Sequence, residues 1–325
     1  MSTATLEPVQ RLIADEMVAV DEVIRRRLYS DVALIRQVSE HIIGGGGKRL
    51  RPALVILAAG ACGYSGVAHY QLAAVVEFIH TATLLHDDVV DDSKLRRGHA
   101  TANALFGNSA SVLVGDFLYS RAFQMMAELR NVRVMDVLAN ATNAIAEGEV
   151  LQLLNCHNSG LSEDDYLKVV RSKTARLFEA AGQLGAIASQ AAPDVEDGLA
   201  RYGTHLGIAF QLIDDVLDYS GDHSQTGKNL GDDLAEGKPT LPLIYAMRSG
   251  NSHQASVIRD AIEQGGLTAF QPVLAAIHET GALEYSRRRA LIESQRAVEA
   301  LTAIPHSSYR DSLLQLAAFA VSRTY

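Results

Sequence analysis

Apolar residues recur three or four positions apart along most of this 325-residue chain, a spacing that predicts amphipathic helices. From Val9 to Ser30, for example, Val20 and Ile24 fall on one side of a helix while Glu22 and Arg26 fall on the other. Further helices are expected over residues 31–43, 68–92, 109–129, 134–154, 162–189 and 201–219, and from Leu241 onward. Strand signals are almost absent, so the pattern predicts an all-α fold.

The composition favours one large core. The chain has only seven prolines and 48% hydrophobic residues, and no proline-rich or serine-rich linker interrupts the helical pattern. We therefore expect residues 1–325 to form a single domain. A net charge of −9 and a pI near 5.6 argue against nucleic acid as a partner, because phosphate-backbone binding needs a basic face.

The sequence also predicts a cytoplasmic location. Cys62 and Cys156 are too few for a disulfide framework and lie in or beside helical stretches, which indicates reduced thiols. Residues 1–8 lack the positive and apolar regions of a signal peptide. The most apolar run, residues 53–62, is far shorter than the roughly 20 residues of a transmembrane helix, so we expect no membrane-spanning segment.

Candidate chemistry is concentrated in two acidic stretches, each at the end of an apolar helix. In the first, HDDVVDD, Asp87 and Asp91 lie one turn apart on one helix face and Asp88 lies at its edge. These carboxylates would repel one another without a divalent cation, and Mg²⁺ takes oxygen ligands while leaving positions for substrate phosphates. Taken alone, the stretch also fits a solvated acidic helix end.

The second stretch, QLIDDVLD, repeats the pattern with Asp214, Asp215 and Asp218. This repetition disfavours the solvated-surface interpretation of the first stretch. Two such stretches facing each other across a helical bundle would hold metal ions and the anion that those ions bind.

A cationic segment follows a run of four glycines. Gly44–Gly47 stop a helix and Pro52 suits the first turn of the next, so Lys48 and Arg51 lie at a helix N-terminus, which favours an anion. Three cations within four residues predict a diphosphate clamp. The alternative is a glycine loop with surface cations, and the spacing of a Walker loop is absent.

Other polar residues fit an anion site, although each also has an ordinary structural explanation. His80 shares the face of the first acidic stretch but also fits a core histidine. Arg96 and Arg97 suit phosphate oxygens, or simply neutralise the acidic helix end. Lys173 interrupts an apolar face beside Thr174, where it would either snorkel to solvent or contact a diphosphate.

Small residues near the acidic stretches indicate either close packing of helices or space for a substrate. Gly203 and Gly207 lie one turn apart inside a helix, and Gln211 precedes the second stretch by one turn. Ala82 and Thr83 put no aromatic side chain in the way of a long apolar tail.

Two further segments have two interpretations each. Met126 lies deep in the predicted helix 109–129, where it fits core packing or the floor of an apolar tunnel. Residues 220–240 are polar and too long for an ordinary connection, which indicates a functional lid or a flexible insert. Lys228 and Lys238 of this segment would close over a metal-bound diphosphate.

Taken in order, these segments resemble those of the trans-isoprenyl diphosphate synthases, and the resemblance covers essentially the whole chain. The motifs that carry it are GGGGKRLRP, HTATLLHDDVVDDSKLRRG, SKTARLFEAA, FQLIDDVLDYSGD and GKPTLPL. Within this family the chain is most similar to bacterial long-chain members.

The resemblance implies an all-α helical bundle around a deep central cavity, acting as a homodimer. It implies Mg²⁺-dependent, sequential head-to-tail condensation of isopentenyl diphosphate onto farnesyl diphosphate, giving an octaprenyl quinone side chain that is delivered to a membrane. Seven, nine or ten isoprene units remain open, with chain length assigned to Ala82, Thr83 and Met126.

The same resemblance assigns roles by motif. The implied metal ligands are Asp87, Asp91 and Asp214, supported by Asp88, Asp215 and Asp218. The implied ligands of isopentenyl diphosphate are Lys48, Arg51, His80 and Arg97. Those of the allylic diphosphate are Arg96, Lys173, Thr174, Gln211, Lys228 and Lys238. The implied catalytic set consists of Asp87, Asp88, Asp91, Arg96, Lys173, Asp214 and Asp215.

Two other classes of protein are alternatives. A terpene cyclase also ionises a diphosphate at a DDxxD motif but uses one substrate, so the second motif and the cationic set around Lys48 speak against it. A helical divalent-ion binder or a noncatalytic partner subunit is disfavoured, because EF-hand spacing is missing and a noncatalytic subunit is expected to have lost its aspartates.

Overall fold

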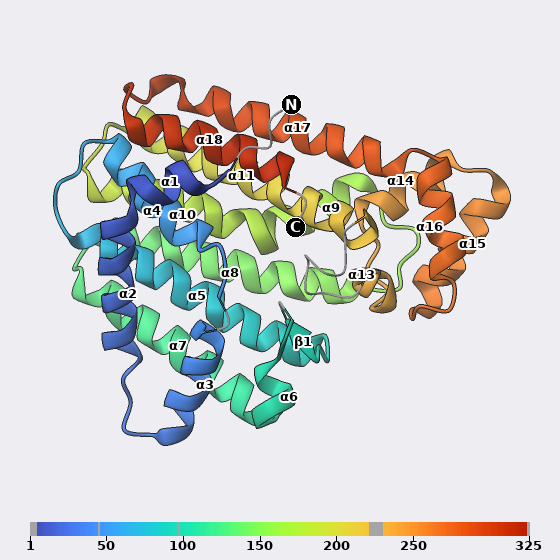
Figure 1. Cartoon of the computed structure of the whole chain (residues 1–325), viewed down its shortest axis with the longest axis horizontal. Helices are drawn as coiled ribbons and strands as arrows, with labels where there is room; N and C mark the ends of the chain where they lie inside the picture. Colours follow the sequence, from blue (N-terminus) through green and yellow to red (C-terminus); the bar gives the residue numbers. More distant parts are fainter. Residues whose placement is uncertain (1–4, 45, 97, 221–229, 324–325) are drawn as a thin grey trace.

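Helices α5 (Ala68–Val90) and α11 (Pro193–Ser220) lie at the centre of the fold, and each carries one acidic stretch at its C-terminal end. They cross the middle of the computed structural model, which describes residues 5–44, 46–96, 98–220 and 230–323 (Figure 1). Helix α10 (Arg176–Ala188) packs against both of them and against α4 (Leu50–Ala61). Helix α4 is buried nearly all round, as its almost wholly apolar sequence requires.

The other elements surround this centre. Before α10 they are α1 (Glu7–Leu12), α2 (Ala14–Leu28), α3 (Ala33–Gly44), α6 (Ala102–Phe106), α7 (Asn108–Glu128), α8 (Val132–Asn155) and α9 (Glu163–Val170). After α11 they are α13 (Asp232–Ala235), α14 (Leu241–Ser249), α15 (Ser252–Gln264), α16 (Phe270–Glu279), α17 (Ala282–Ala300) and α18 (Ser308–Ser322). A π turn (Arg171–Ala175) joins α9 to α10, and a 3-10 turn (Leu301–Ala303) follows α17.

The predicted all-α fold is confirmed. Among the described residues, the β-structure consists of one antiparallel pair, β1 (Leu95–Arg96) and β2 (His99–Ala100). The helix expected over residues 9–30 is divided at Ile13, because α1 packs on α18 while α2 packs on α5. The division lets both Val9 and Ile13 reach the core, where each is at most 3% exposed.

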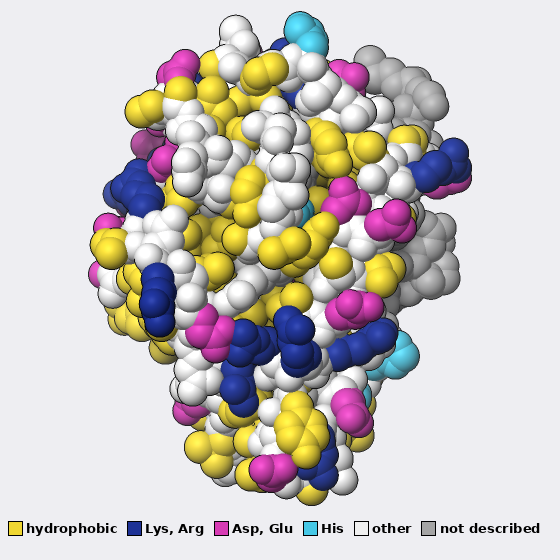
Figure 2. Space-filling view, turned by 90° about the vertical axis from the view of Figure 1, so that its left-hand side faces the viewer, with side chains coloured by type: hydrophobic (Ala, Val, Ile, Leu, Met, Phe, Trp, Pro, Cys, Tyr) yellow, Lys and Arg dark blue, Asp and Glu magenta, His cyan; other side chains and the backbone are white. Residues whose placement is uncertain are grey.

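The end of the bundle that carries α2 has a mixed surface. Figure 2 shows this end with hydrophobic side chains scattered between charged ones and a group of Lys and Arg side chains across its lower half. Scattered apolar side chains of this kind are normal on a protein surface. No helix of the described residues combines the length and the apolarity needed to cross a bilayer.

Candidate active site

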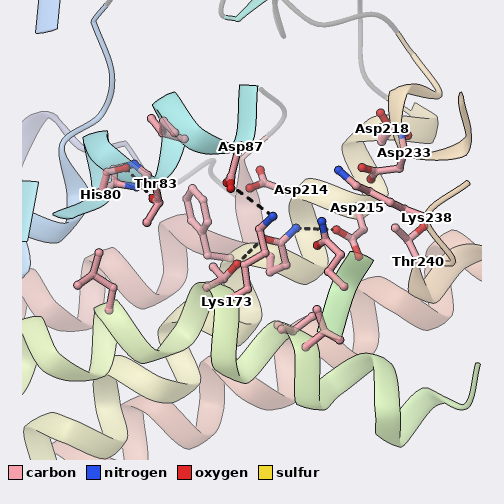
Figure 3. A pocket seen from close by; sticks show the side chains of 18 of the residues that line it. His80, Thr83, Asp87, Lys173, Asp214, Asp215, Asp218, Asp233, Lys238 and Thr240 are labelled. Carbon is pink, nitrogen blue, oxygen red and sulfur yellow. Dashed lines mark hydrogen bonds and ion pairs between the residues drawn. The ribbon is translucent and has the colours of Figure 1, made fainter. Parts of the chain in front are cut away.

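A cavity of about 890 Å³ lies between α5, α8, the π turn and α11, and both acidic stretches line it. Its other walls come from the segment before α4, from the segment that includes Lys238, and from the end of α18. Figure 3 shows Asp87 and Asp214 directed toward the same space, with Lys173 below them and Lys238 to one side. The two acidic stretches therefore face each other, as the sequence predicted.

Asp87 lies next to a buried cation. The Lys173 ammonium is 2.6 Å from Glu149 Oε2 and 3.6 Å from Asp87 Oδ2. Burial raises the pKa of Asp87, and Lys173 opposes that rise. Burial also raises the pKa of Glu149, to about 7. For Lys173, burial lowers the pKa, but Asp87 and Glu149 outweigh it and the net shift is upward, so this lysine stays charged at neutral pH.

Asp91 has an equivalent partner from a distant segment. Lys238 Nζ lies 3.0 Å from Asp91 Oδ2 and also pairs with Glu236. Burial again opposes the charge, but Asp91 leads the carboxylates that raise the pKa of Lys238 above its ordinary value. Lys238 therefore lies beside the first acidic stretch, and its contact with a diphosphate stays a prediction.

Asp88, the second carboxylate of the first stretch, is fully buried and holds Arg96 instead of facing the cavity. Its Oδ1 accepts hydrogen bonds from Arg96 Nε at 2.9 Å and Arg96 Nη2 at 2.6 Å. The amide of Asn103 donates to the Asp88 backbone carbonyl. Asp88 thus fixes a guanidinium that lines the cavity, which agrees with a supporting role.

Asp214, in the second stretch, meets a residue that the sequence did not single out. Arg323 Nη1 lies 2.6 Å from Asp214 Oδ1, and the guanidinium stacks 3.7 Å from the centre of the Phe210 ring. The Arg323 side chain is only 3% exposed and lines the cavity. No motif marks this arginine, because it simply follows the last amphipathic helix.

Asp215 is 2% exposed and lies in a chain of hydrogen bonds. Tyr166 donates its hydroxyl to Asp215 Oδ2, and Gln211 Nε2 donates to Asp215 Oδ1 at 2.8 Å. Thr174 Oγ1 in turn donates to Gln211 Oε1 at 2.9 Å. The sequence predicted the last two residues but not Tyr166, although Tyr166 precedes Lys173 by seven positions and so shares its helix face.

The carboxylates fit a divalent metal by chemistry. Asp87, Asp91 and Asp214 line one cavity, together with Asp218, whose Oδ2 accepts from the backbone N–H of Asp233. Among the residues that the structure describes, no three His, Cys, Asp or Glu side chains converge closely enough to hold a metal ion. Because the three predicted ligands each pair with a cation, a divalent ion would compete with Lys173, Lys238 and Arg323 for carboxylate oxygens.

The predicted diphosphate clamp lies beside the acidic residues in the same cavity. Lys48 is 5.4 Å from the centre of the Phe319 ring, and Arg51 is 4.4 Å from that of Phe178. Arg51 Nη1 also lies 3.2 Å from His80 Nε2, so the structure brings Arg51 and His80 together. Arg49 instead pairs with Asp21 on α2.

The π turn that carries Lys173 and Thr174 is held between two helices by glycines. A Cβ added at Gly148 of α8 would lie 2.7 Å from the Lys173 backbone nitrogen, and one at Gly207 of α11 would lie 2.6 Å from Ala175 Cα. Close helix packing therefore explains Gly207, one of the two explanations considered from sequence, and also Gly203, where a Cβ would meet Phe178 O at 2.2 Å. Such turns often occur at functional sites.

A second, more apolar cavity of about 600 Å³ adjoins the first between α5 and α8. Thr83, Asp87 and Glu149 line both cavities, and Tyr119 of α7 lies in the wall of the second. Glu149 follows Ile145 by one helical turn on this inward face, a signal that could have marked it from the sequence.

Two residues of the sequence analysis have no role in these contacts, and two others cannot be placed. Ala82 and Met126 are fully buried in the core and line neither cavity, so their effect on product length stays a prediction. Arg97 and Lys228 lie outside the described residues.

Comparisons with known proteins agree over nearly the whole chain. The sequence model of the polyprenyl synthetase family matches residues 32–276. Octaprenyl diphosphate synthase of Escherichia coli (strain K12) is 55% identical over 319 residues, which cover 98% of this chain and 99% of that protein. The all-trans-nonaprenyl-diphosphate synthase (geranyl-diphosphate specific) of Rhodobacter capsulatus is 47% identical, with 96% of each chain covered.

A solved structure shares the fold in full. Polyprenyl synthase from Caulobacter crescentus CB15, crystallised with calcium and isoprenyl diphosphate, superposes with a TM-score of 0.97. It is 43% identical in sequence, and the match covers 100% of both chains.

Proposed function

The chain belongs to the polyprenyl synthetase family, and from this premise we propose that it builds octaprenyl diphosphate by adding isopentenyl diphosphate units to farnesyl diphosphate. Its class follows from the identity to relatives over nearly the full length: it is a prenyltransferase, a long-chain trans-polyprenyl diphosphate synthase. The observation that carries the proposal is the placement of two DDxxD motifs on one cavity with cations beside them.

The family uses a divalent metal, and we propose Mg²⁺ for this chain. Asp87, Asp91 and Asp214 would hold it, since carboxylate oxygens are the ligands that this ion prefers. When bound, Mg²⁺ stabilises the negative charge that develops on a departing diphosphate.

The allylic diphosphate lies, in this proposal, on the acidic side of the cavity. Lys173, Lys238 and Arg96 place positive charge there, and Asp87, Asp91 and Asp88 hold these three groups in position. Cations fixed where charge develops favour heterolysis of the allylic C–O bond, which leaves an allylic carbocation. Thr174 and Gln211 line the same wall. Lys228 belongs to this set by resemblance alone.

Isopentenyl diphosphate occupies, in this proposal, the side formed by Lys48, Arg51 and His80. Its double bond attacks the carbocation, a new C–C bond forms, and a proton is lost to the departed diphosphate. No protein nucleophile is needed. The apolar walls keep water from the cation, which would otherwise be quenched. Arg97 would join this side by resemblance.

The growing tail would enter the apolar cavity between α5 and α8. This cavity begins at Thr83 and Asp87, next to the diphosphate groups, and continues past Ile145 and Tyr119. A tail in it would lie against apolar walls, which fits a long product. Ala82 and Met126 would affect length from the core behind these walls.

We also propose a cytoplasmic homodimer in which residues 1–325 act as one domain. Helices α7 and α8 expose large apolar side chains, including Leu113 at 66%, Leu153 at 61% and Leu154 at 73%. A second copy packed on these helices would cover them. Cys62 and Cys156 are both unpaired thiols, which fits a reducing compartment. We expect the product to pass to a membrane.

Radiolabelled isopentenyl diphosphate tests the activity. The purified protein is incubated with Mg²⁺, label and farnesyl diphosphate, and the product is identified by mass spectrometry. We expect label in a prenyl diphosphate of eight isoprene units. A parallel reaction with geranyl diphosphate tests the primer. Metal-dependent cyclic products formed without isopentenyl diphosphate would overturn the proposal.

A further inference from the structure

Tyr166 lines the cavity from α9 and ends a chain of hydrogen bonds that leads to two further cavity residues, Gln211 and Thr174. Its side chain belongs to α9, and its hydroxyl donates to the buried carboxylate of Asp215 on α11. The residue is only 6% exposed. Tyr166 thus connects the helix before the π turn to the helix that carries the second acidic stretch.

Each oxygen of Asp215 has one donor. Oδ2 accepts from Tyr166, and Oδ1 accepts from Gln211 Nε2 at 2.8 Å. A carboxylate that is 2% exposed needs such partners, because burying an unpaired charge is costly. Burial, followed by the nearby Asp233, raises the pKa of Asp215, and the two donors oppose that rise.

These bonds fix the orientation of the Gln211 amide. Its NH₂ group points at Asp215, so its carbonyl oxygen points at Thr174, whose hydroxyl donates to it at 2.9 Å. Both Gln211 and Thr174 line the cavity. If the amide flipped, its NH₂ group would meet a hydroxyl and its carbonyl would meet a carboxylate, which removes the bond to Asp215.

We infer that Tyr166 is a positioning residue for the allylic side of the site: through Asp215 it sets the orientation of Gln211 and Thr174. This inference rests on the proposed function, because it assigns the allylic diphosphate to that wall. Tyr166 also lines the cavity, but its proposed effect comes through the hydrogen bond of its hydroxyl to Asp215. Its loss should affect the handling of the allylic substrate while binding of isopentenyl diphosphate, beside Arg51, stays as it is.

Tyr166→Phe tests the inference, with Tyr202→Phe as the matched control. Tyr202 is also fully buried, and its hydroxyl donates at 2.7 Å to the carbonyl of Leu313, a bond that does not involve the cavity. Each variant loses one buried hydroxyl. We measure kcat, the KM for farnesyl diphosphate and the KM for isopentenyl diphosphate, with thermal unfolding in parallel.

We expect Tyr166→Phe to lower kcat/KM for farnesyl diphosphate by about tenfold, the loss that corresponds to one hydrogen bond to a charged group. Its KM for isopentenyl diphosphate should stay within about twofold of wild type. Tyr202→Phe should lower the unfolding temperature but leave kcat and the KM for both substrates unchanged. Equal kinetics of the two variants would overturn the inference, whereas inactive wild-type protein would instead refute the proposed function.

A double-mutant cycle separates positioning from general destabilisation. Thr174→Val removes the bond at the other end of the chain. If the residues act as a unit, the double variant Tyr166→Phe/Thr174→Val should have the same kcat/KM for farnesyl diphosphate as the less active of the two single variants. Additive losses would contradict the inference. Should Tyr166→Phe fail to fold, Asp215→Asn takes its place in the same cycle, because it keeps the side-chain shape but leaves one acceptor oxygen for the two donors, Tyr166 and Gln211.

Discussion

Lys238 lies 3.0 Å from Asp91, although 147 residues separate the two in the chain. The contact joins the end of α5 to the turn after α13 and places a raised-pKa ammonium at the edge of the first acidic stretch. Lys238→Met keeps the apolar stem and removes the charge. We expect kcat/KM for farnesyl diphosphate to fall by about tenfold or more, since one charged contact to the diphosphate is lost.

Lys168→Met is the matched control for that experiment. Lys168 pairs with Asp165 on the exposed side of α9 and does not line the cavity. We compare kcat/KM for farnesyl diphosphate of both variants by steady-state kinetics. If the two variants lose activity equally, the assigned role of Lys238 is wrong.

Asp87→Ala removes a proposed metal ligand and the partner of Lys173. Turnover should fall by about a hundredfold or more, because the charge on the leaving diphosphate is no longer balanced. The fold should survive, since Asp87 lines a cavity and not the core. Asp92→Ala is the control, at a carboxylate that is 74% exposed. Near-normal turnover of Asp87→Ala with an intact circular dichroism spectrum would refute the assignment.

Arg323→Met tests the competition between metal and guanidinium at Asp214. Without Mg²⁺ the variant should lose about 1–2 kcal/mol of unfolding free energy, because the ion pair of a buried guanidinium with the partly exposed Asp214 is broken. The deficit should shrink as Mg²⁺ is added, since the metal then compensates the carboxylate. Arg201→Met, at an exposed pair with Asp197, provides the comparison in the same thermal unfolding series. A deficit independent of Mg²⁺ would contradict this expectation.

Glu149 predicts how stability depends on pH. Burial raises its pKa in the folded protein to about 7, whereas in the unfolded chain it stays near its ordinary value of 4.5. Between these values the folded state binds more protons, so the free energy of unfolding falls as pH rises from about 4.5 to about 7 and levels off above that. The metal-free protein should therefore melt at least about 2 °C higher at pH 5.5 than at pH 8 on account of this group.

Glu149→Gln isolates that contribution, because the amide cannot titrate. Its melting temperature should change less between these two pH values than that of wild type. An identical pH dependence of the two proteins would show that other carboxylates cause it.

Tyrosine substitutions along α5 test the path of the product. Thr83 lines both cavities, so Thr83→Tyr should shorten the product by blocking the tail. Ala82→Tyr should also shorten it, but by pushing a large ring into a fully buried core position, and with a loss of stability of about 1–3 kcal/mol. Mass spectrometry reads the chain length. An unchanged product from Thr83→Tyr would refute the proposed path.

The sequence was enough to predict the helices and the two acidic stretches, because helical periodicity and carboxylate spacing are local properties. Asp87 and Asp91 share a face whatever the rest of the chain does. The meeting of the two stretches in one cavity was inferred from their repetition, and the structure places both there. The broken first helix was not predicted, because its cause is the packing of α1 on α18.

Tyr166 and Arg323 show why the rest of the site was missed. Their importance comes from partners far away in the chain, such as Asp214 for Arg323 and Asp215 for Tyr166. A tyrosine on an apolar helix face and an arginine after a final helix have no pattern of their own. Only the tertiary arrangement distinguishes them from ordinary core and surface residues.

At the π turn between α9 and α10, the site depends on the number of residues in the polypeptide. The turn inserts an extra residue into an otherwise regular helix, and Gly148 and Gly207 leave space for its backbone alone. Deleting one residue between Val170 and Arg176 would restore an ordinary helix and change the direction of the side chains inside the turn relative to its flanks. Lys173 would then no longer face the same wall as Tyr166, so the site depends on the number of residues in this turn as well as on their side chains.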